Sequence, residues 1–431
     1  MHFKALVQKQ RDFFDTGATN SVEFRKQQLN KLREVVVTNR QKYVDAIHND
    51  LRRPKQFCEV EVDGITGEID YFLKNLDEWV KPEKKSDEPL GSTFIYKLPL
   101  GVVLNISPFN FPIGLAIRPI TAALAAGNTV VLKPSENSEN SSTVLAETLN
   151  QAFPPELLVV VEGDAHVSQS LLEERYDSIF YTGSPEIGRS IMSAAAQHLT
   201  PVTLELGGKC PCVILDTPDV EKLAQSLVNA KWMNCGQVCL TIDYVLITPQ
   251  LKDKFIESFV TAIKKTFGEK PKESPLYSRL ISTRHYNRVM NMIKKTNGKL
   301  IYKSDDETDH DDKYIGPHVY EVEPDDQLMQ DEVFGPILSI LTVDDLDSAI
   351  KFINKREKPL GAYVYTSDDA KAERFFQEVH CGNSCHNSMM TNYFSLNIPF
   401  GGVGQSGMGR YHGIYGFKTF THEKATVRSN L

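Results

Sequence analysis

Two cysteines four residues apart, Cys235 and Cys239, lie in the stretch NAKWMNCGQVCLTIDY, residues 229–244. Thiols at such a spacing can bind a metal, pack as small apolar side chains, or include one nucleophile. A helix that ends near residue 234 is predicted by apolar residues at helical spacing, namely Val220, Leu223, Leu227, Ala230 and Met233. Cys239 then lies on a loop before the strand YVLIT, where free backbone N–H groups favour an ionised, reactive thiol. Cys235 is expected to pack against apolar neighbours.

The remaining cysteines do not complete a metal site. Two further close pairs are Cys210 with Cys212 and Cys381 with Cys385, and no histidine array matches them. No metal is therefore expected. Small buried side chains are the interpretation for every cysteine except Cys239.

A single acidic residue, Glu205, interrupts the apolar stretch PVTLELGGKCPCVIL. A carboxyl group among apolar residues has a raised pKa, which suits a general base that exchanges protons near neutral pH. A solvated carboxylate at a strand end is the alternative.

Two turns have features of nucleotide contacts. In YTGSPEIG a strand runs into Gly183 and Ser184, and Pro185 begins a helix, so free N–H groups could face a pyrophosphate. In LKPSE, Lys133 and Glu136 could bind the hydroxyl groups of an adenosine ribose. A plain structural corner and an exposed ion pair remain the alternatives for these two turns.

The elements that would position these residues alternate regularly from residue 101. Buried strand patterns (GVVLNIS, TVVLKPS, LLVVVEG, DSIFYTG) are separated by helical ones, which predicts a doubly wound parallel sheet within an α/β fold. Ligands bind beyond the carboxyl ends of such strands, so Asn110, Lys133, Glu136 and Gly183 are candidates by position. Residues 21 to about 79 read as amphipathic helices, and the charged stretch 80–91 as a linker or a departure from the domain surface.

Composition excludes several classes of protein. The 431 residues carry a formal net charge of -8 without a basic stripe, so no nucleic-acid partner is expected. Seven cysteines indicate no disulfide framework, and neither a signal peptide nor a membrane span is apparent. A cytoplasmic protein is expected. The final residues SNL resemble a peroxisomal SKL address, with an ordinary frayed tail as the alternative.

Seven motifs in order make the chain resemble the NAD(P)-dependent aldehyde dehydrogenase superfamily over about residues 5–425. The motifs are SPFNFP, AALAAGNTVVLKPSE, YTGSPEIG, LELGGK, NCGQVC, DEVFGPIL and PFGGVGQSGMGRYHG. The short N-terminus and the ending GMGRYHGIYGFKTFTHEK look most like the class 3 and fatty aldehyde dehydrogenase branch.

The resemblance implies roles for individual residues. Cys239 matches the nucleophile, Asn110 the side chain that stabilises the oxyanion, and Glu205 the base that activates water for thioester hydrolysis. Contacts to NAD(P) are implied for Lys133 and Glu136 at the adenosine ribose, for Gly183, Ser184, Pro185, Glu186, Ile187 and Gly188 at the pyrophosphate, and for Glu332 and Phe334 at the nicotinamide ribose.

Two stretches depart from the class 3 pattern. TIDY stands where those relatives usually have APDY, and SCHNSMMTNYFSLN, residues 384–397, differs more, although Asn387 still fits. The resemblance implies that the second stretch leads toward the substrate funnel, so this departure bears on the identity of the aldehyde. Glu136 would repel a 2′-phosphate, which favours NAD, and NADP stays possible.

The expected organisation follows the resemblance. A cofactor domain is expected from residues 1–80 and 101–205, a catalytic domain from 206–391, and bridging segments of a homodimer from 81–100 and 392–431. Oxidation of medium- or long-chain aliphatic or aromatic aldehydes to acids is the predicted function. The alternatives are a CoA-acylating dehydrogenase, which generally lacks the glutamate, and an inactive binding or structural protein on the same scaffold.

Overall fold

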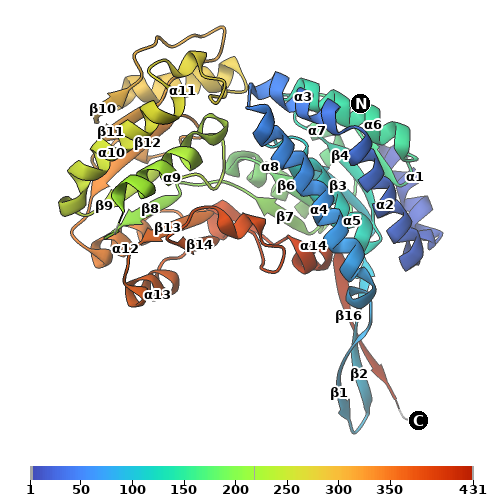
Figure 1. Ribbon diagram of the computed structural model, residues 1–431. Helices are drawn as coiled ribbons and strands as arrows, with labels where there is room; N and C mark the ends of the chain where they lie inside the picture. The colour runs from blue at the N-terminus through green and yellow to red at the C-terminus, as the bar shows by residue number, and fades with distance from the viewer. Residues whose placement is uncertain (1–2, 218, 430–431) are drawn as a thin grey trace.

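The computed structural model describes residues 3–217 and 219–429, which form two lobes, each built on a mainly parallel β-sheet (Figure 1). A small third sheet projects from the body beneath one lobe, and the C-terminal strand runs along it (Figure 1). This architecture confirms the predicted α/β class with a doubly wound parallel sheet.

The first sheet has the strand order β15-β7-β6-β3-β4-β5, and all its neighbours are parallel except β15. Its strands are β3 (Val102–Ile106), β4 (Thr129–Lys133), β5 (Leu158–Val160), β6 (Ser178–Thr182), β7 (Val202–Glu205) and β15 (Gly407–Met408). After β3 the chain forms β4 on one side of β3, and it later forms β6 on the other side of β3. A doubly wound sheet places its ligand crevice at this reversal.

Both faces of the first sheet are covered because successive side chains on a strand point to opposite faces. Val103 belongs to one hydrophobic core, whereas its neighbours Val102 and Leu104 belong to another. The helices of this lobe are α1 (Lys4–Asp15), α2 (Val22–Thr38), α3 (Arg40–Leu51), α4 (Lys55–Trp79), α5 (Gly114–Ala126), α6 (Glu139–Ala152), α7 (Ala165–Leu172), α8 (Pro185–Ala196) and α14 (Gly413–Thr419), with a short 3₁₀ turn η1 (Ala18–Asn20).

The region from residue 21 to about 79 is helical, as expected, and it is divided into three helices. The break between α3 and α4 falls at Arg52, whose φ of 48° is left-handed, and at Pro54, which precedes α4. Proline disfavours a helical conformation in the residue before it, so α3 cannot continue into α4. Arg53 lies at this break.

The second sheet has the order β10-β11-β12-β9-β8-β13-β14 and is parallel except at β10. Its strands are β8 (Pro211–Ile214), β9 (Tyr244–Ile247), β10 (Lys299–Lys303), β11 (His318–Glu321), β12 (Ile337–Thr342), β13 (Gly361–Tyr365) and β14 (Asn383–His386). The helices here are α9 (Val220–Trp232), α10 (Pro249–Phe267), α11 (Thr283–Lys295), α12 (Leu346–Asn354) and α13 (Asp369–Glu378). Short 3₁₀ turns connect them: η2 (Met233–Gly236), η3 (Pro271–Glu273), η4 (Gln327–Met329), η5 (Thr391–Phe394) and η6 (Gly404–Ser406).

The third sheet joins the two segments expected to bridge a dimer. It contains β1 (Glu83–Glu88), β2 (Gly91–Pro99) and β16 (Thr421–Arg428) in antiparallel order β1-β2-β16. The stretch 80–91 is therefore mostly a strand and its turn, and it does depart from the body. Part of 392–431 also belongs to the first lobe, because β15 pairs with β7 and α14 packs on α4 and α5.

The candidate site residues lie at the carboxyl edge of the first sheet and at the amino edge of the second sheet. Asn110, Lys133, Gly183 and Glu205 follow or end strands of the first sheet, at its carboxyl edge. In the second sheet, by contrast, Cys239 precedes β9, and the segment with Glu332 and Phe334 precedes β12, which is the amino edge.

Candidate active site

Cys239 lies on the loop between η2 and β9 and is partly exposed. Its backbone carbonyl accepts a hydrogen bond from the thiol of Cys210 at 3.3 Å. Burial first, and then the negative charges of Glu332 and Glu205, raise the pKa of the Cys239 thiol to about 12. The ionised thiol expected from the loop position is therefore not favoured in the cofactor-free protein, because the loop is enclosed and faces two carboxyl groups.

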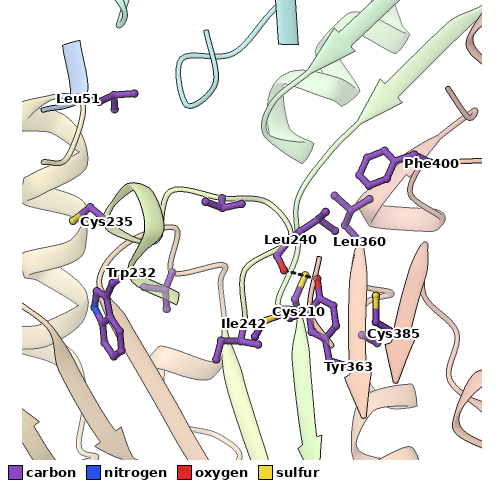
Figure 2. Packing of buried hydrophobic residues seen from close by; sticks show 14 of the residues in the cluster. Leu51, Cys210, Trp232, Cys235, Leu240, Ile242, Leu360, Tyr363, Cys385 and Phe400 are labelled. Carbon is purple, nitrogen blue, oxygen red and sulfur yellow. Dashed lines mark hydrogen bonds between the residues drawn. The ribbon is translucent and has the colours of Figure 1, made fainter. Parts of the chain in front are cut away.

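Cys235 is fully buried, as expected for a packing residue. Its sulfur lies 3.9 Å from the hydroxyl of Tyr277, and burial raises its pKa to about 12. Figure 2 shows Cys235 with Trp232 on one side of this region and Cys210 with Leu240 on the other. The two cysteines of the opening motif thus occupy different environments, and only Cys239 has exposed surface.

Three consecutive left-handed residues turn the chain from α9 into the Cys239 loop. Their φ angles are 53° for Asn234, 56° for Cys235 and 75° for Gly236. A Cβ on Gly236 would lie 2.1 Å from the carbonyl oxygen of Gly335, so only glycine fits at this position. This contact joins the loop of Cys239 to the segment that carries Glu332 and Phe334.

Asn110 is buried at the carboxyl edge of the first sheet and is bonded to the Cys239 loop. Its side-chain amide donates to the carbonyl of Gln237 at 3.1 Å, two residues before Cys239. Its own backbone carbonyl accepts from Asn234 Nδ2 at 2.9 Å. An amide nitrogen carries two N–H groups, so one remains for another acceptor.

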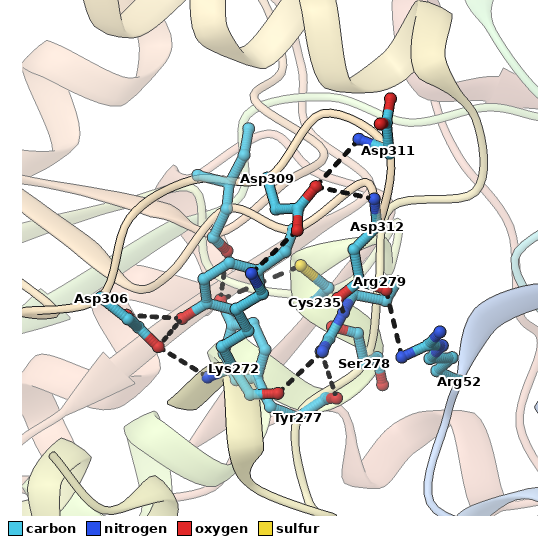
Figure 3. Close-up of polar contacts among 12 residues, drawn as sticks. Arg52, Cys235, Lys272, Tyr277, Ser278, Arg279, Asp306, Asp309, Asp311 and Asp312 are labelled. Carbon is cyan, nitrogen blue, oxygen red and sulfur yellow. Dashed lines mark hydrogen bonds and ion pairs between the residues drawn. The ribbon is translucent and has the colours of Figure 1, made fainter. Parts of the chain in front are cut away.

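Gln237 fixes the same loop from the other side. Its side chain donates to the carbonyl of Arg279 at 2.9 Å and accepts from the backbone N–H of Ile281 at 3.0 Å. Arg279 in turn pairs with Asp312, which also contacts Arg52 of the first lobe at 3.1 Å (Figure 3). The loop of the nucleophile candidate is thus tied to both lobes.

Glu205 ends β7 as a buried carboxyl group. Among the residues that the structure describes, neither of its carboxyl oxygens has a hydrogen-bond partner. Burial raises its pKa well above the usual range, and Arg410 lowers it by a smaller amount. The raised pKa expected from the sequence is confirmed, and such a group can accept a proton near neutral pH.

Lys133 and Glu136 lie at the end of β4, beside a pocket of about 270 Å³. Lys133 is buried, and its ammonium donates to the carbonyl of Pro134 at 2.6 Å and lies 3.6 Å from Glu136. Burial lowers the pKa of Lys133. The pocket is lined by Pro134, Glu136, Glu139, Ser142, Glu162, Gly163 and Asp164, four of which are acidic.

The turn from Gly183 to Gly188 leads from β6 into α8, as the sequence predicts. Ser184 caps α8 by accepting from the backbone N–H of Ile187 at 3.4 Å, and Pro185 and Glu186 occupy its first turn. A Cβ on Gly183 would lie 2.1 Å from the hydroxyl of Tyr181. The N–H groups of Gly183, Ser184, Ile187 and Gly188 already donate to protein oxygens, so the turn offers fewer free N–H groups than its sequence suggests. The positive end of α8 still fits an anionic pyrophosphate, and the acidic pocket fits ribose hydroxyls, so these residues suit a dinucleotide.

Glu332 and Phe334 lie on a segment whose backbone is hydrogen-bonded by several side chains. Arg288 donates to the carbonyls of Glu332, Val333 and Phe334 at 3.2, 2.6 and 3.2 Å. Burial, and then the charge of Asp243, raise the pKa of Glu332 to about 8. A Cβ on Gly207 would lie 2.1 Å from the Glu332 carboxylate, so this carboxylate faces the turn that follows Glu205.

Several supporting residues have no motif of their own. Lys209 pairs with Asp243 and also donates to the carbonyls of Leu328 and Asp331, while Asp243 accepts from the N–H of Val333 at 2.8 Å. Lys209 stands inside LELGGK and Asp243 inside TIDY, which are the signals available in the sequence. Arg288 lies on α11 without any such signal.

Within residues 3–217 and 219–429, no group of three His, Cys, Asp or Glu side chains could hold a metal ion. The same part of the chain contains no helix that is both long and apolar enough to cross a membrane. Asn430 and Leu431, two of the three residues of the SNL ending, lie outside the described residues.

Comparisons with known proteins agree with this geometry. The aldehyde dehydrogenase family profile matches residues 1–426. The "Aldehyde dehydrogenase family 3 member A2" of Pongo abelii is 41% identical over 430 residues, covering 99% of this chain and 88% of the relative.

Solved structures show the same fold. The "Substrate bound state of Staphylococcus Aureus AldH" has a TM-score of 0.95 at 34% identity and covers 100% of this chain and 95% of that one. The P. syringae indole-3-acetaldehyde dehydrogenase AldA, in complex with NAD+, has a TM-score of 0.90 at 27% identity over 98% and 88% of the two chains. The chain belongs to the aldehyde dehydrogenase family, and it is an enzyme that oxidises aldehydes with NAD(P) as cofactor.

Proposed function

We propose that the chain oxidises medium- or long-chain aliphatic or aromatic aldehydes to carboxylic acids through a covalent intermediate on Cys239, hydrolysed with the help of Glu205. The observation that supports this proposal most is that residues from both lobes meet around Cys239. Cys239 lies close enough to Glu332 and Glu205 for their charges to raise its pKa, and Asn110 is bonded to its loop.

In the first step the thiol of Cys239 gives its proton to solvent water and its sulfur attacks the aldehyde carbon, so that a C–S bond forms as the carbonyl electron pair moves onto oxygen. The free N–H of the Asn110 amide and the backbone N–H of Cys239 are the donors for that oxyanion. A preorganised donor of this kind contributes about 3 kcal/mol to transition-state stabilisation.

Bound NAD(P)+ would supply the hydride acceptor, and Cys239 would then hold the oxidised carbon as a thioester. Lys133 and Glu136 bind the adenosine ribose, Gly183 to Gly188 the pyrophosphate, and Glu332 with Phe334 the nicotinamide ribose. Four acidic residues line the pocket at Glu136, which favours NAD over NADP because a 2′-phosphate would be repelled.

Glu205 then takes a proton from water, which attacks the thioester carbon. The C–S bond breaks, the acid leaves, and the sulfur of Cys239 regains its proton. The raised pKa of Glu205 suits this role, because the group must bind the proton and release it again.

Aromatic rings near Glu205 support an apolar substrate. A Cβ on Gly401 would lie 3.0 Å from a Glu205 oxygen, and the preceding Phe400 packs against Tyr393 at 5.3 Å between ring centroids. Phe394, on the same turn as Tyr393, is 70% exposed. These rings would offer an apolar contact surface to an aldehyde that approaches Glu205.

The assembly and location follow from other features. Within the part of the chain that the structure describes, the third sheet ends in two edge strands, β1 and β16, and such edges can pair with a second copy of this chain in a homodimer. All seven cysteines are free, which fits a reducing compartment such as the cytoplasm.

Two variants test the assignment of the nucleophile. Cys239→Ser is expected to abolish NADH formation with hexanal, whereas Cys235→Ala keeps most of it. Equal loss in the two variants would contradict the assignment.

A further inference from the structure

Arg53 lies at the break between α3 and α4, far in sequence from every motif of the site, and is completely buried. A buried guanidinium requires partners, because its desolvation is costly. Arg53 has two of them. It donates to the backbone carbonyl of Asn110 at 3.1 Å and forms an ion pair with Glu61 of α4.

Glu61 binds the same loop at a second point. Its other carboxyl oxygen accepts from the backbone N–H groups of Ile113 at 3.1 Å and Gly114 at 2.7 Å. These N–H groups belong to the start of α5, where the helix has no partners of its own. The buried pair therefore holds both ends of the loop from Asn110 to Gly114.

The Arg53 side chain is fixed as well. Its guanidinium lies over the ring of Phe111 at 4.8 Å, and its backbone carbonyl is bonded to His48 Nδ1 at 2.8 Å. A planar guanidinium that is held in this way determines the direction of the N–H bond to Asn110.

The Asn110 peptide receives two donors at one carbonyl, from Arg53 and from Asn234. The side-chain amide of Asn110 donates one of its two N–H groups to the backbone carbonyl of Gln237. The position of the backbone and that single bond together determine where the second N–H points. An oxyanion donor is effective only if it is preorganised in this way.

We propose that Arg53 and Glu61 are positioning residues for Asn110: they clamp residues 110–114 so that the free N–H of the Asn110 amide faces the oxygen that becomes negative above Cys239. This inference rests on the proposed function of Asn110. Arg53 and Glu61 are both buried and bonded to residues 110–114, so each would act on the site through this loop.

The experiment is a double-mutant cycle in the full chain. Arg53→Lys keeps the charge but cannot reach Glu61 and Asn110 with the same fork of donors. It is expected to lower kcat/KM for hexanal on the order of tenfold, as misplacement of a catalytic group does. KM for NAD+ should stay within about twofold. In an Asn110→Ala background, Arg53→Lys should cause no further loss, because nothing remains to be positioned.

Glu61→Gln provides a second cycle with a nearly isosteric side chain, and it decides the question if Arg53→Lys does not fold. The amide oxygen can still accept from the N–H groups of Ile113 and Gly114, but the amide nitrogen cannot accept from Arg53, so the same non-additive loss is expected. Arg25→Lys is the matched control. Arg25 is also buried and bonded to backbone carbonyls, including Ala125 at the opposite end of α5. Its substitution should lower the melting temperature without changing kcat/KM.

The outcomes separate this inference from the proposed function. Suppose that Asn110→Ala lowers kcat/KM, and that Arg53→Lys lowers it by the same factor with and without Asn110. The positioning role of Arg53 and Glu61 is then wrong, and the proposed role of Asn110 stands. If Asn110→Ala leaves kcat/KM unchanged, Asn110 is not the oxyanion donor and both are wrong. An equal loss for Arg25→Lys would also overturn the clamp, because it would show a general effect on stability.

Discussion

Glu332 is the negative charge that acts most strongly on the thiol of Cys239, and after burial it is the main cause of the raised pKa of that thiol. The two residues are brought to the same edge of the second sheet, because Glu332 precedes β12 and Cys239 precedes β9. The cofactor-free enzyme should therefore keep Cys239 protonated at neutral pH.

The rate of alkylation by iodoacetamide should reflect this pKa. Only the thiolate reacts, so with a pKa of about 12 the rate should rise about tenfold per pH unit from pH 7 to pH 10 without a plateau. Because the pKa of Glu332 is itself raised to about 8, its negative charge is present mainly above that pH. Glu332→Gln removes this charge, so it should raise the alkylation rate at pH 10 more than at pH 7. Mass spectrometry should locate the label on Cys239, and a plateau below pH 8 would contradict the enclosed site.

Glu205→Gln should separate the two halves of the reaction. The amide cannot accept a proton from water, so thioester hydrolysis slows while hydride transfer continues. A stopped-flow trace is expected to show a rapid burst of NADH at 340 nm, followed by turnover on the order of a hundredfold slower than in the wild type. Loss of the burst together with turnover would instead place Glu205 in the first half.

The cofactor pocket should discriminate by charge. Four carboxyl groups line the pocket beside β4, so kcat/KM should be higher with NAD+ than with NADP+. Glu136→Gln removes one of them and should narrow the preference by improving the use of NADP+. The substitution Glu147→Gln, on the same helix α6 but outside this pocket, is the control. An unchanged preference in Glu136→Gln would show that Glu136 does not face the 2′ position.

The aromatic rings proposed to contact the aldehyde offer a test of substrate charge. The guanidinium of Arg118 lies over the ring of Tyr393 at 5.7 Å and is paired with the buried Glu68. Because this pair is neutral, uncharged aldehydes such as hexanal should be preferred over 6-oxohexanoate. Glu68→Gln leaves the positive charge of Arg118 unpaired, and it should raise the relative kcat/KM for 6-oxohexanoate. If the ratio is unchanged, Arg118 does not face the substrate.

Much of the fold and the candidate site could be predicted from the sequence because the signals are local. The glycine turn at Gly183 and the isolated carboxylate Glu205 each lie within a few residues of their strand, and both lie where the strand pattern placed them. The burial of Cys235 was also predictable, although the residue lies in the left-handed turn η2 after α9 and not on the apolar face of that helix.

Contacts between distant segments could not be predicted in the same way. Arg53 meets Asn110 across 57 residues, and Arg288 holds a segment 44 to 46 residues away, without any periodic pattern that links them. The protonation of Cys239 depends on how tightly the second lobe encloses its loop, which a loop position alone does not show. The strand β1 was hidden because its exposed, charged residues look like those of a linker.

The most direct test of the account is NADH formation at 340 nm with acetaldehyde, hexanal, hexadecanal and benzaldehyde, with and without CoA, in the wild type and in Cys239→Ser. We predict activity in the wild type that increases from acetaldehyde to the longer aldehydes, is indifferent to CoA, and is absent in Cys239→Ser. Activity that requires CoA, or that persists in Cys239→Ser, would contradict hydrolysis of a Cys239 thioester.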